Sequence, residues 1–133
     1  MRNVSLFYDY VDMDGVNVIK TRLDELGPKA TAKLNTKLNV LEQMSRTEWG
    51  STSITEVLSG DKDGLIAVRV KYQGIQYRLL GYDGPHRGEF TLLAWGKERN
   101  NKYIPLDIGR KAFERRTATE ANPFVRRTRH DFG

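Results

Sequence analysis

Hydrophobic and polar positions alternate most clearly in residues 65–83, LIAVRVKYQGIQYRLLGYD. β-Branched and aromatic side chains recur at every second position on both sides of Gln73-Gly74, which is typical of two antiparallel strands joined by a two-residue turn. This pattern predicts a hairpin in which Arg69 lies directly opposite Arg78. Like charges in such a cross-strand pair repel each other. The pair is therefore expected either to extend into water or to hold an anion.

Two helices are predicted before this hairpin. Residues 4–11 have the composition of a strand, and hydrophobic residues then recur at helical spacing from Val16 to Leu26 and from Pro28 to about Arg46. The very short link between the two stretches predicts an antiparallel helical hairpin whose hydrophobic stripes face the core. Its polar faces are expected to be solvated, including the lysines Lys33 and Lys37.

The remaining segments complete an α+β pattern. Residues 54–58 indicate a short edge strand, residues 89–95 a further strand, and Leu106–Arg116 a last helix with Pro105 in its first turn. We expect a two-layer α+β fold in which the N-terminal strand and helical hairpin pack on an antiparallel sheet of three to four strands, followed by a C-terminal helix. Residues 1–116 form one domain in this prediction, and residues 117–133 form a flexible basic tail.

The composition excludes several kinds of site and several classes of protein. The 133 residues suit a single domain, and the absence of cysteine excludes disulfides, thiolate metal sites and a cysteine nucleophile. The first residues resemble a strand more than a signal peptide, and no run approaches the roughly 20 apolar residues of a membrane span. We therefore expect a cytoplasmic protein that does not contact a membrane.

The positive charge is unevenly distributed. The net charge is +5, and residues 97–133 contain ten Lys and Arg against five Asp and Glu, whereas residues 1–96 contain twelve of each. This asymmetry indicates a polyanionic partner, of which nucleic acid is the first candidate. A basic tail without a dedicated partner is the alternative.

Few groups are candidates for chemistry. The two histidines, His86 and His130, lack metal-ligand spacing, and glycine-rich nucleotide-binding motifs are absent, so we expect no metal and no cofactor. What remains is a set of cations with one phenol: Arg69, Lys71 and Arg78 in the hairpin, and Lys97, Arg99, Lys102 and Tyr103 after the next strand.

Such a set suits a phosphodiester. Guanidinium groups bind phosphate oxygens through paired hydrogen bonds, and tyrosine can stack on a base. A lysine among other cations has its charged form disfavoured and can act as a base. The same residues would also suit RNA binding without catalysis.

The chain resembles the RelE/HigB toxins of bacterial type II toxin–antitoxin systems. The resemblance is carried by Gly64–Lys71, Tyr77–Leu80, Leu92-Leu93 and a lysine-containing loop that ends at Pro105 before a helix, over roughly residues 4–116. The sequence departs from the family pattern at Ala67, where the family has glutamate. It also departs at Ala94-Trp95-Gly96, where the family often has a histidine.

The resemblance implies a metal-independent, ribosome-dependent mRNA endonuclease that is held inactive by a partner antitoxin. In this family the RNA 2′-OH attacks the adjacent phosphate and leaves a 2′,3′-cyclic phosphate and a 5′-OH. The implied catalytic residues are Arg69 and Arg78 for the phosphorane charge, Lys71 or Lys97 as base with Glu98 as a weaker candidate, and Arg99 or Tyr103 at the leaving group. The implied RNA-binding residues are Lys102, Arg110, Arg126 and Arg127. Some family members use a C-terminal histidine, a part that His130 could play, although a place in the flexible tail is favoured.

Two other functions remain open from the sequence. One is a gyrase inhibitor similar to the ParE toxins, which share the fold without the ribonuclease cluster. The other is a non-catalytic RNA- or protein-binding module, such as a decayed toxin.

Overall fold

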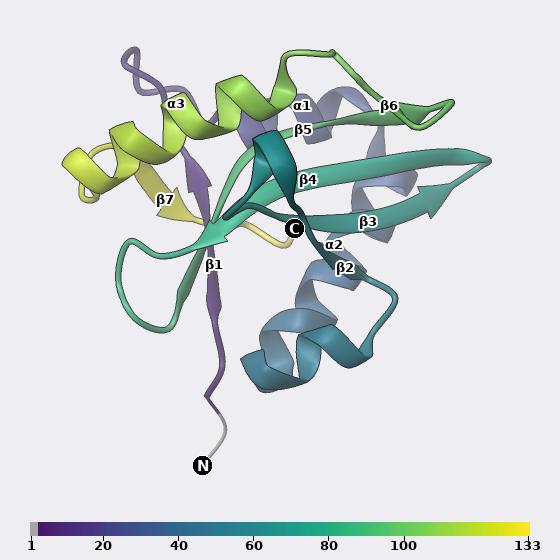
Figure 1. The fold of residues 1–133 in the computed structure, drawn as a ribbon, viewed down its shortest axis with the longest axis horizontal. Helices are drawn as coiled ribbons and strands as arrows, with labels where there is room; N and C mark the ends of the chain where they lie inside the picture. Colours follow the sequence, from purple (N-terminus) through teal and green to yellow (C-terminus); the bar gives the residue numbers. More distant parts are fainter. Residues whose placement is uncertain (1–2) are drawn as a thin grey trace.

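The structure, a computed structural model, describes residues 3–133. It contains helices together with short and long strands (Figure 1). In chain order the elements are β1 (Leu6–Tyr10), α1 (Val18–Glu25), α2 (Pro28–Gln43), the 3₁₀ helix η1 (Arg46–Ser51), β2 (Thr55–Val57), the 3₁₀ helix η2 (Gly60–Lys62), β3 (Ile66–Tyr72), β4 (Ile75–Asp83), β5 (Glu89–Arg99), β6 (Lys102–Ile104), α3 (Ile108–Ala121) and β7 (Arg127–Arg129). None of the helices in this described part is long and apolar enough to cross a membrane.

The strands form one sheet in the order β2-β3-β4-β5-β1-β7, and β6 pairs with β5. Among the strands of residues 3–133, only β1 and β5 run parallel, and the other pairs are antiparallel. The predicted α+β class is confirmed, but the sheet has seven strands instead of three or four, because β1, which was expected to pack on the sheet, is one of its strands and β6 and β7 extend it. The additional strands β6 and β7 have three residues each, which is too short for a recognisable alternation of hydrophobic and polar positions.

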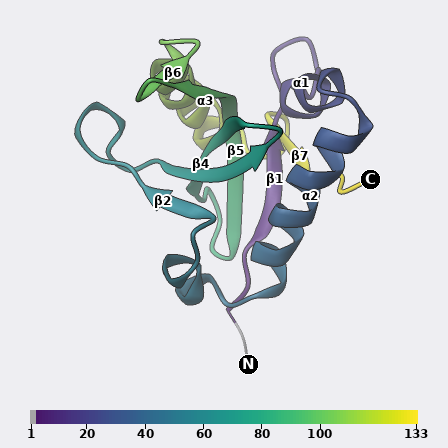
Figure 2. The ribbon, with the colours of Figure 1, turned by 90° about the vertical axis from the view of Figure 1, so that its right-hand side faces the viewer.

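Helices pack on both faces of this sheet. The helical hairpin of α1 and α2 covers one face, as predicted, and α3 covers part of the other (Figure 2). Val68 and Leu79 pack in the core beneath the helical hairpin, whereas Ala67 and Leu80 belong to a second core cluster that includes Ala112 of α3. Because side chains alternate between the faces of a strand, this assignment fixes the side on which each polar residue of β3 and β4 projects.

The β3–β4 hairpin has the predicted register, with Tyr72 opposite Ile75 and Arg69 opposite Arg78. Its turn residues Gln73 and Gly74 both have positive φ, at 50° and 80°. A two-residue turn with positive φ at both positions matches the right-handed twist of the flanking strands. The turn therefore places Arg69 and Arg78 next to each other.

The C-terminal segment differs from the predicted flexible tail. α3 continues to Ala121, and β7 pairs antiparallel with β1. His130 then enters the core, where its Nδ1 lies 2.8 Å from Asp9 Oδ1 and its Nε2 lies 2.7 Å from Asn35 Oδ1. These are polar contacts with residues far away in the chain, which local periodicity does not report.

Candidate functional site

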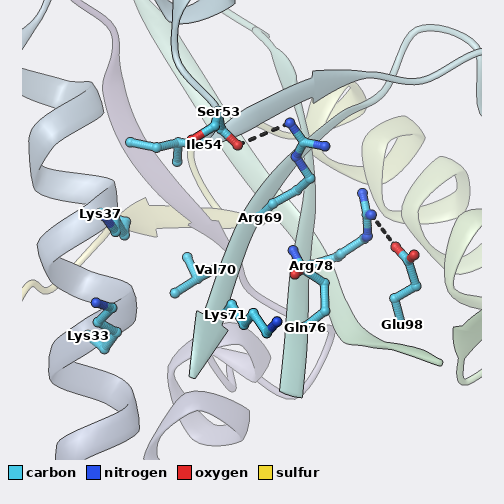
Figure 3. Close-up of a pocket in the computed structure, with 10 residues that line it drawn as sticks. All are labelled: Lys33, Lys37, Ser53, Ile54, Arg69, Val70, Lys71, Gln76, Arg78 and Glu98. Carbon is cyan, nitrogen blue, oxygen red and sulfur yellow. Dashed lines mark hydrogen bonds and ion pairs between the residues drawn. The ribbon is translucent and has the colours of Figure 1, made fainter. Parts of the chain in front are cut away.

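Arg69 and Arg78 project from the centre of the sheet on the face that also carries α3. Arg69 lies two residues after Ala67 and Arg78 two residues before Leu80, so both share the face of these core residues and lie just beyond the region that α3 covers. Arg78 is 8% exposed, whereas the side chain of Arg69 is 30% exposed. Lys71 continues the same row and is exposed (Figure 3).

Two carboxylates neutralise the arginine pair. Glu56 on β2 places Oε1 2.7 Å from Arg78 Nη1 and Oε2 3.7 Å from Arg69 Nη1. Glu98 on β5 forms an ion pair with Arg78 Nη2. Arg69 also donates a hydrogen bond of 3.0 Å to the Ser53 carbonyl oxygen. The repulsion expected from the register is therefore offset by acidic residues of the neighbouring strands.

Tyr103 borders this cluster from β6. It pairs with Glu98 in the sheet, and its ring centroid lies 5.7 Å from Arg78 Cζ. The chain can cross the face here because residue 96 is glycine: a Cβ at Gly96 would lie 2.4 Å from the Ile104 carbonyl oxygen. Burial raises the pKa of Tyr103 and outweighs the opposing effect of the Arg78 charge. The phenol consequently keeps its proton at neutral pH.

A hollow of about 530 Å³ lies along the outer edge of β3 and reaches the arginine pair. Pairing between β2 and β3 begins at Thr55 and Val68, and the Arg69 amide donates to the Ile54 carbonyl oxygen at 2.6 Å. Beyond this point β3 has no further neighbour on its outer side among residues 3–133. The residues that line the hollow are Lys33, Lys37, Ser53, Ile54, Arg69, Val70, Lys71, Gln76, Arg78 and Glu98 (Figure 3).

The lysines of α2 were not among the predicted site residues. Lys33 and Lys37 are one helical turn apart and project toward the hollow from the other side of β3 (Figure 3). In the part of the chain that the structure describes, neither lysine has an ion pair, and the same holds for Lys71. Helical periodicity could identify their shared polar face, but it could not identify the strand edge opposite.

Lys97, Arg99 and Lys102 do not join Arg69 and Arg78. Lys97 lies opposite Tyr77, a core residue beneath the helical hairpin, so Lys97 projects from that face. Arg99 follows at the next alternate position, and Lys102 lies opposite Arg99 in the β5–β6 pair. The sequence prediction grouped these cations by their distance along the chain, whereas the alternation of β5 separates them from Arg78.

The other predicted RNA-binding residues lie elsewhere and contact groups of the protein itself. Arg110 is exposed on α3 and pairs with Asp107 and Glu114. Arg126 Nη1 donates to the Asp12 carbonyl oxygen at 3.0 Å. Arg127, with 5% of its side chain exposed, places Nη1 2.7 Å from Glu89 Oε1. Through Asp12 and Glu89, Arg126 and Arg127 thus connect the C-terminal segment to the chain near β1 and to β5.

Within residues 3–133, no group of three or more His, Cys, Asp or Glu side chains is arranged to hold a metal ion. His86 is exposed in the β4–β5 connection, with Nδ1 3.1 Å from Glu89 Oε1. His130 is buried between Asp9 and Asn35, as described above. Neither histidine contacts the arginine pair.

Comparison with known proteins leaves the family open. No protein-family model, no curated protein and no solved structure matches the chain. The resemblance to the RelE/HigB toxins therefore stays a prediction from sequence.

Proposed function

We propose that the protein is a metal-independent endoribonuclease of the toxin type, which acts in the cytoplasm on mRNA held by the ribosome and is inhibited by a partner antitoxin protein. The single observation that carries the proposal is the placement of Arg69 directly opposite Arg78 on one face of the sheet, where both line a hollow that is also lined by further cations. Neighbouring guanidinium groups suit the charge that develops on a phosphate during nucleophilic attack.

The proposed reaction uses the RNA's own 2′-OH as nucleophile. The 2′ oxygen forms a bond to phosphorus, the bond from phosphorus to the 5′ oxygen breaks, and the products are a 2′,3′-cyclic phosphate and a 5′-OH end. Arg69 and Arg78 stabilise the additional negative charge of the phosphorane. One base takes the proton of the 2′-OH, and one acid supplies a proton to the departing 5′ oxygen.

The arrangement of groups on this face favours particular residues for these proton transfers. Glu98 contacts Arg78, and a carboxylate is able to accept the 2′-OH proton. Tyr103 retains its proton and suits the leaving oxygen. Lys71 is exposed, and its amino group suits a contact with a non-bridging or adjacent phosphate oxygen. We therefore favour Glu98 as base over Lys71, and Lys97 is disfavoured because it projects from the other face.

The test is inducible expression followed by mapping of cellular RNA ends. We expect growth arrest with 5′-OH fragments within translated mRNA, and we expect Arg69→Ala to reduce the fragments by at least about 100-fold, the usual effect of removing one transition-state donor. Arg99→Ala, which removes an arginine from the other face, serves as the matched control and should cleave as the unchanged protein does. Full cleavage by Arg69→Ala would refute the proposal, as would gyrase–DNA adducts without RNA fragments.

A non-catalytic binding module is the second candidate. The observation in its favour is that Glu56 and Glu98 already neutralise Arg78, so the site is less cationic than the arginines alone would make it. A binding module should retain RNA without generating new ends and should not arrest growth when it is induced.

A further inference from the structure

Glu56 lies where a phosphate group would have to bind in order to contact both arginines. Its two carboxylate oxygens face Arg78 at 2.7 Å and Arg69 at 3.7 Å, so one anionic group spans the pair. Carboxylates and phosphates use the same paired hydrogen bonds with guanidinium groups. The Glu56 carboxylate thus occupies the position between Arg69 and Arg78 that a phosphate of the proposed substrate requires.

We propose that Glu56 is an exchangeable carboxylate, which occupies the position between Arg69 and Arg78 in the unbound protein and is displaced by a phosphate group of a single-stranded nucleic acid. This inference rests on the proposed function for the identity of the ligand, but the exchange itself is a binding event that requires no cleavage. Glu56 then sets the affinity of the site and keeps weaker anions out.

The two acidic residues differ in how firmly they are held. Glu56 belongs to β2, a three-residue strand that pairs with β3 at the edge of the described sheet, and its side chain is 42% exposed. Glu98 belongs to β5, which is paired with β4 on one side and β6 on the other, and its side chain is 24% exposed. Short edge strands with few contacts open most easily. Glu56 is therefore the carboxylate that moves, and Glu98 stays with Arg78.

The hydrogen bonding of the arginines is incomplete while Glu56 is in place. The Nε atoms of Arg69 and Arg78 are both buried and have no hydrogen-bond partner among the described residues. Buried donors without an acceptor are uncommon because they lose hydration without gaining a hydrogen bond. A phosphate group carries more oxygens than a carboxylate, so exchange can satisfy donors that Glu56 leaves unused.

Three lysines favour a polymeric ligand over an isolated phosphate ion. Lys33, Lys37 and Lys71 line the hollow and have no ion pair within residues 3–133. Their charges are available for phosphates that precede or follow the one bound between the arginines. A nucleic-acid strand gains these contacts together, which compensates for the displacement of Glu56.

Binding of a fluorescent single-stranded oligodeoxynucleotide, which has no 2′-OH and cannot be cleaved by the proposed reaction, tests the exchange. If Glu56 occupies the position for about nine-tenths of the time, Glu56→Gln should bind about tenfold more tightly. Asp61→Asn is the matched control. It removes one negative charge, as Glu56→Gln does, but Asp61 is exposed in η2 beside Lys62. We expect less than a twofold change for this variant.

Equal affinities of Glu56→Gln and Asp61→Asn would overturn the inference, as would tighter binding by Glu56→Gln that persists after Arg69→Ala is added. A thermal unfolding curve of Glu56→Gln shows whether the fold is kept. The proposed function is judged separately by RNA end mapping. Tighter binding by Glu56→Gln without any cleavage by the unchanged protein supports the exchange and refutes the nuclease. Cleavage by the unchanged protein with no gain in binding by Glu56→Gln supports the nuclease and refutes the exchange.

Discussion

Arg78 joins the two carboxylates of the site, because its guanidinium group contacts both Glu56 and Glu98. Its burial gives it a structural role that Arg69 lacks. Without Arg78, Glu98 would lose its ion pair and Glu56 would keep only the longer contact of 3.7 Å with Arg69 among the described residues. The two arginines are equivalent in the sequence pattern, and the structure separates them by exposure and by number of acidic partners.

This difference predicts unequal effects on stability. Arg78→Ala should lower the free energy of unfolding by about 2 kcal/mol, since breaking a largely buried ion pair leaves its partners uncompensated, although both glutamates can reach water. Arg69→Ala should cost less than about 1 kcal/mol, as is usual for partly exposed pairs. Urea unfolding followed by circular dichroism measures both values. Equal losses would show that the burial of Arg78 does not determine its contribution.

Pairwise register was predictable at the residue scale, whereas the partners of the arginines were not. The turn at Gln73 and Gly74 and the alternation of β3 and β4 were sufficient to place Arg69 opposite Arg78. Glu56 and Glu98 come from strands on either side of the hairpin, and their registers depend on connections that carry no comparable turn motif. A local pattern specifies a hairpin, and it does not specify which acidic residues lie beside it.

At the scale of elements, β7 shows how a segment without hydrophobic alternation can be held in a sheet. Its three residues read Arg-Thr-Arg, and its ion pairs lie between Arg127 and Glu89 at 2.7 Å and between Arg129 and Glu42 at 2.9 Å. The positive charge of this segment was predicted from the sequence to bind an external anion. Here the charge is used inside the protein, which neither composition nor periodicity can distinguish.

Acid is predicted to loosen β7 through Glu89. Burial alone would raise the pKa of Glu89, but the hydrogen bond and charge of Arg127 lower that pKa below the usual 4.5. Because the pKa of the folded state is the lower one, the stabilisation is complete above about pH 4.5 and is lost as the pH falls through the folded value. Hydrogen-exchange protection factors of residues 127–130, compared between pH 7 and pH 3.5, should fall.

Glu89→Gln provides the control for this acid effect. The variant should show reduced protection of β7 already at pH 7 and a smaller further loss in acid. Glu42 and Asp9, which contact Arg129 and His130, are present in both proteins, so the difference between the two isolates Glu89. Identical pH profiles would contradict the assignment.

The whole molecule presents two separate sets of cations, one on each face of the sheet. Lys71 accompanies Arg69 and Arg78 on the face of α3, whereas Lys97 and Arg99 project from the face of the helical hairpin. Net charge and its position along the chain predicted a basic surface. They could not predict this division, because it depends on the alternation of single residues along β5.

The division between faces predicts that the rate of RNA cleavage depends more on which face a cation occupies than on the total charge of the protein. Lys71→Gln removes one charge beside the arginine pair and should reduce RNA cleavage at least about tenfold, since a cation near the reacting phosphate stabilises the transition state. The double variant Lys97→Gln/Arg99→Gln removes two charges and should reduce cleavage less than twofold in vitro at moderate salt. Single-turnover rates on the same ribosome-bound mRNA, at equal and saturating protein concentration, separate chemistry from binding. The opposite ranking would place the chemistry on the face of the helical hairpin and would exclude Arg69 and Arg78 as the reacting pair.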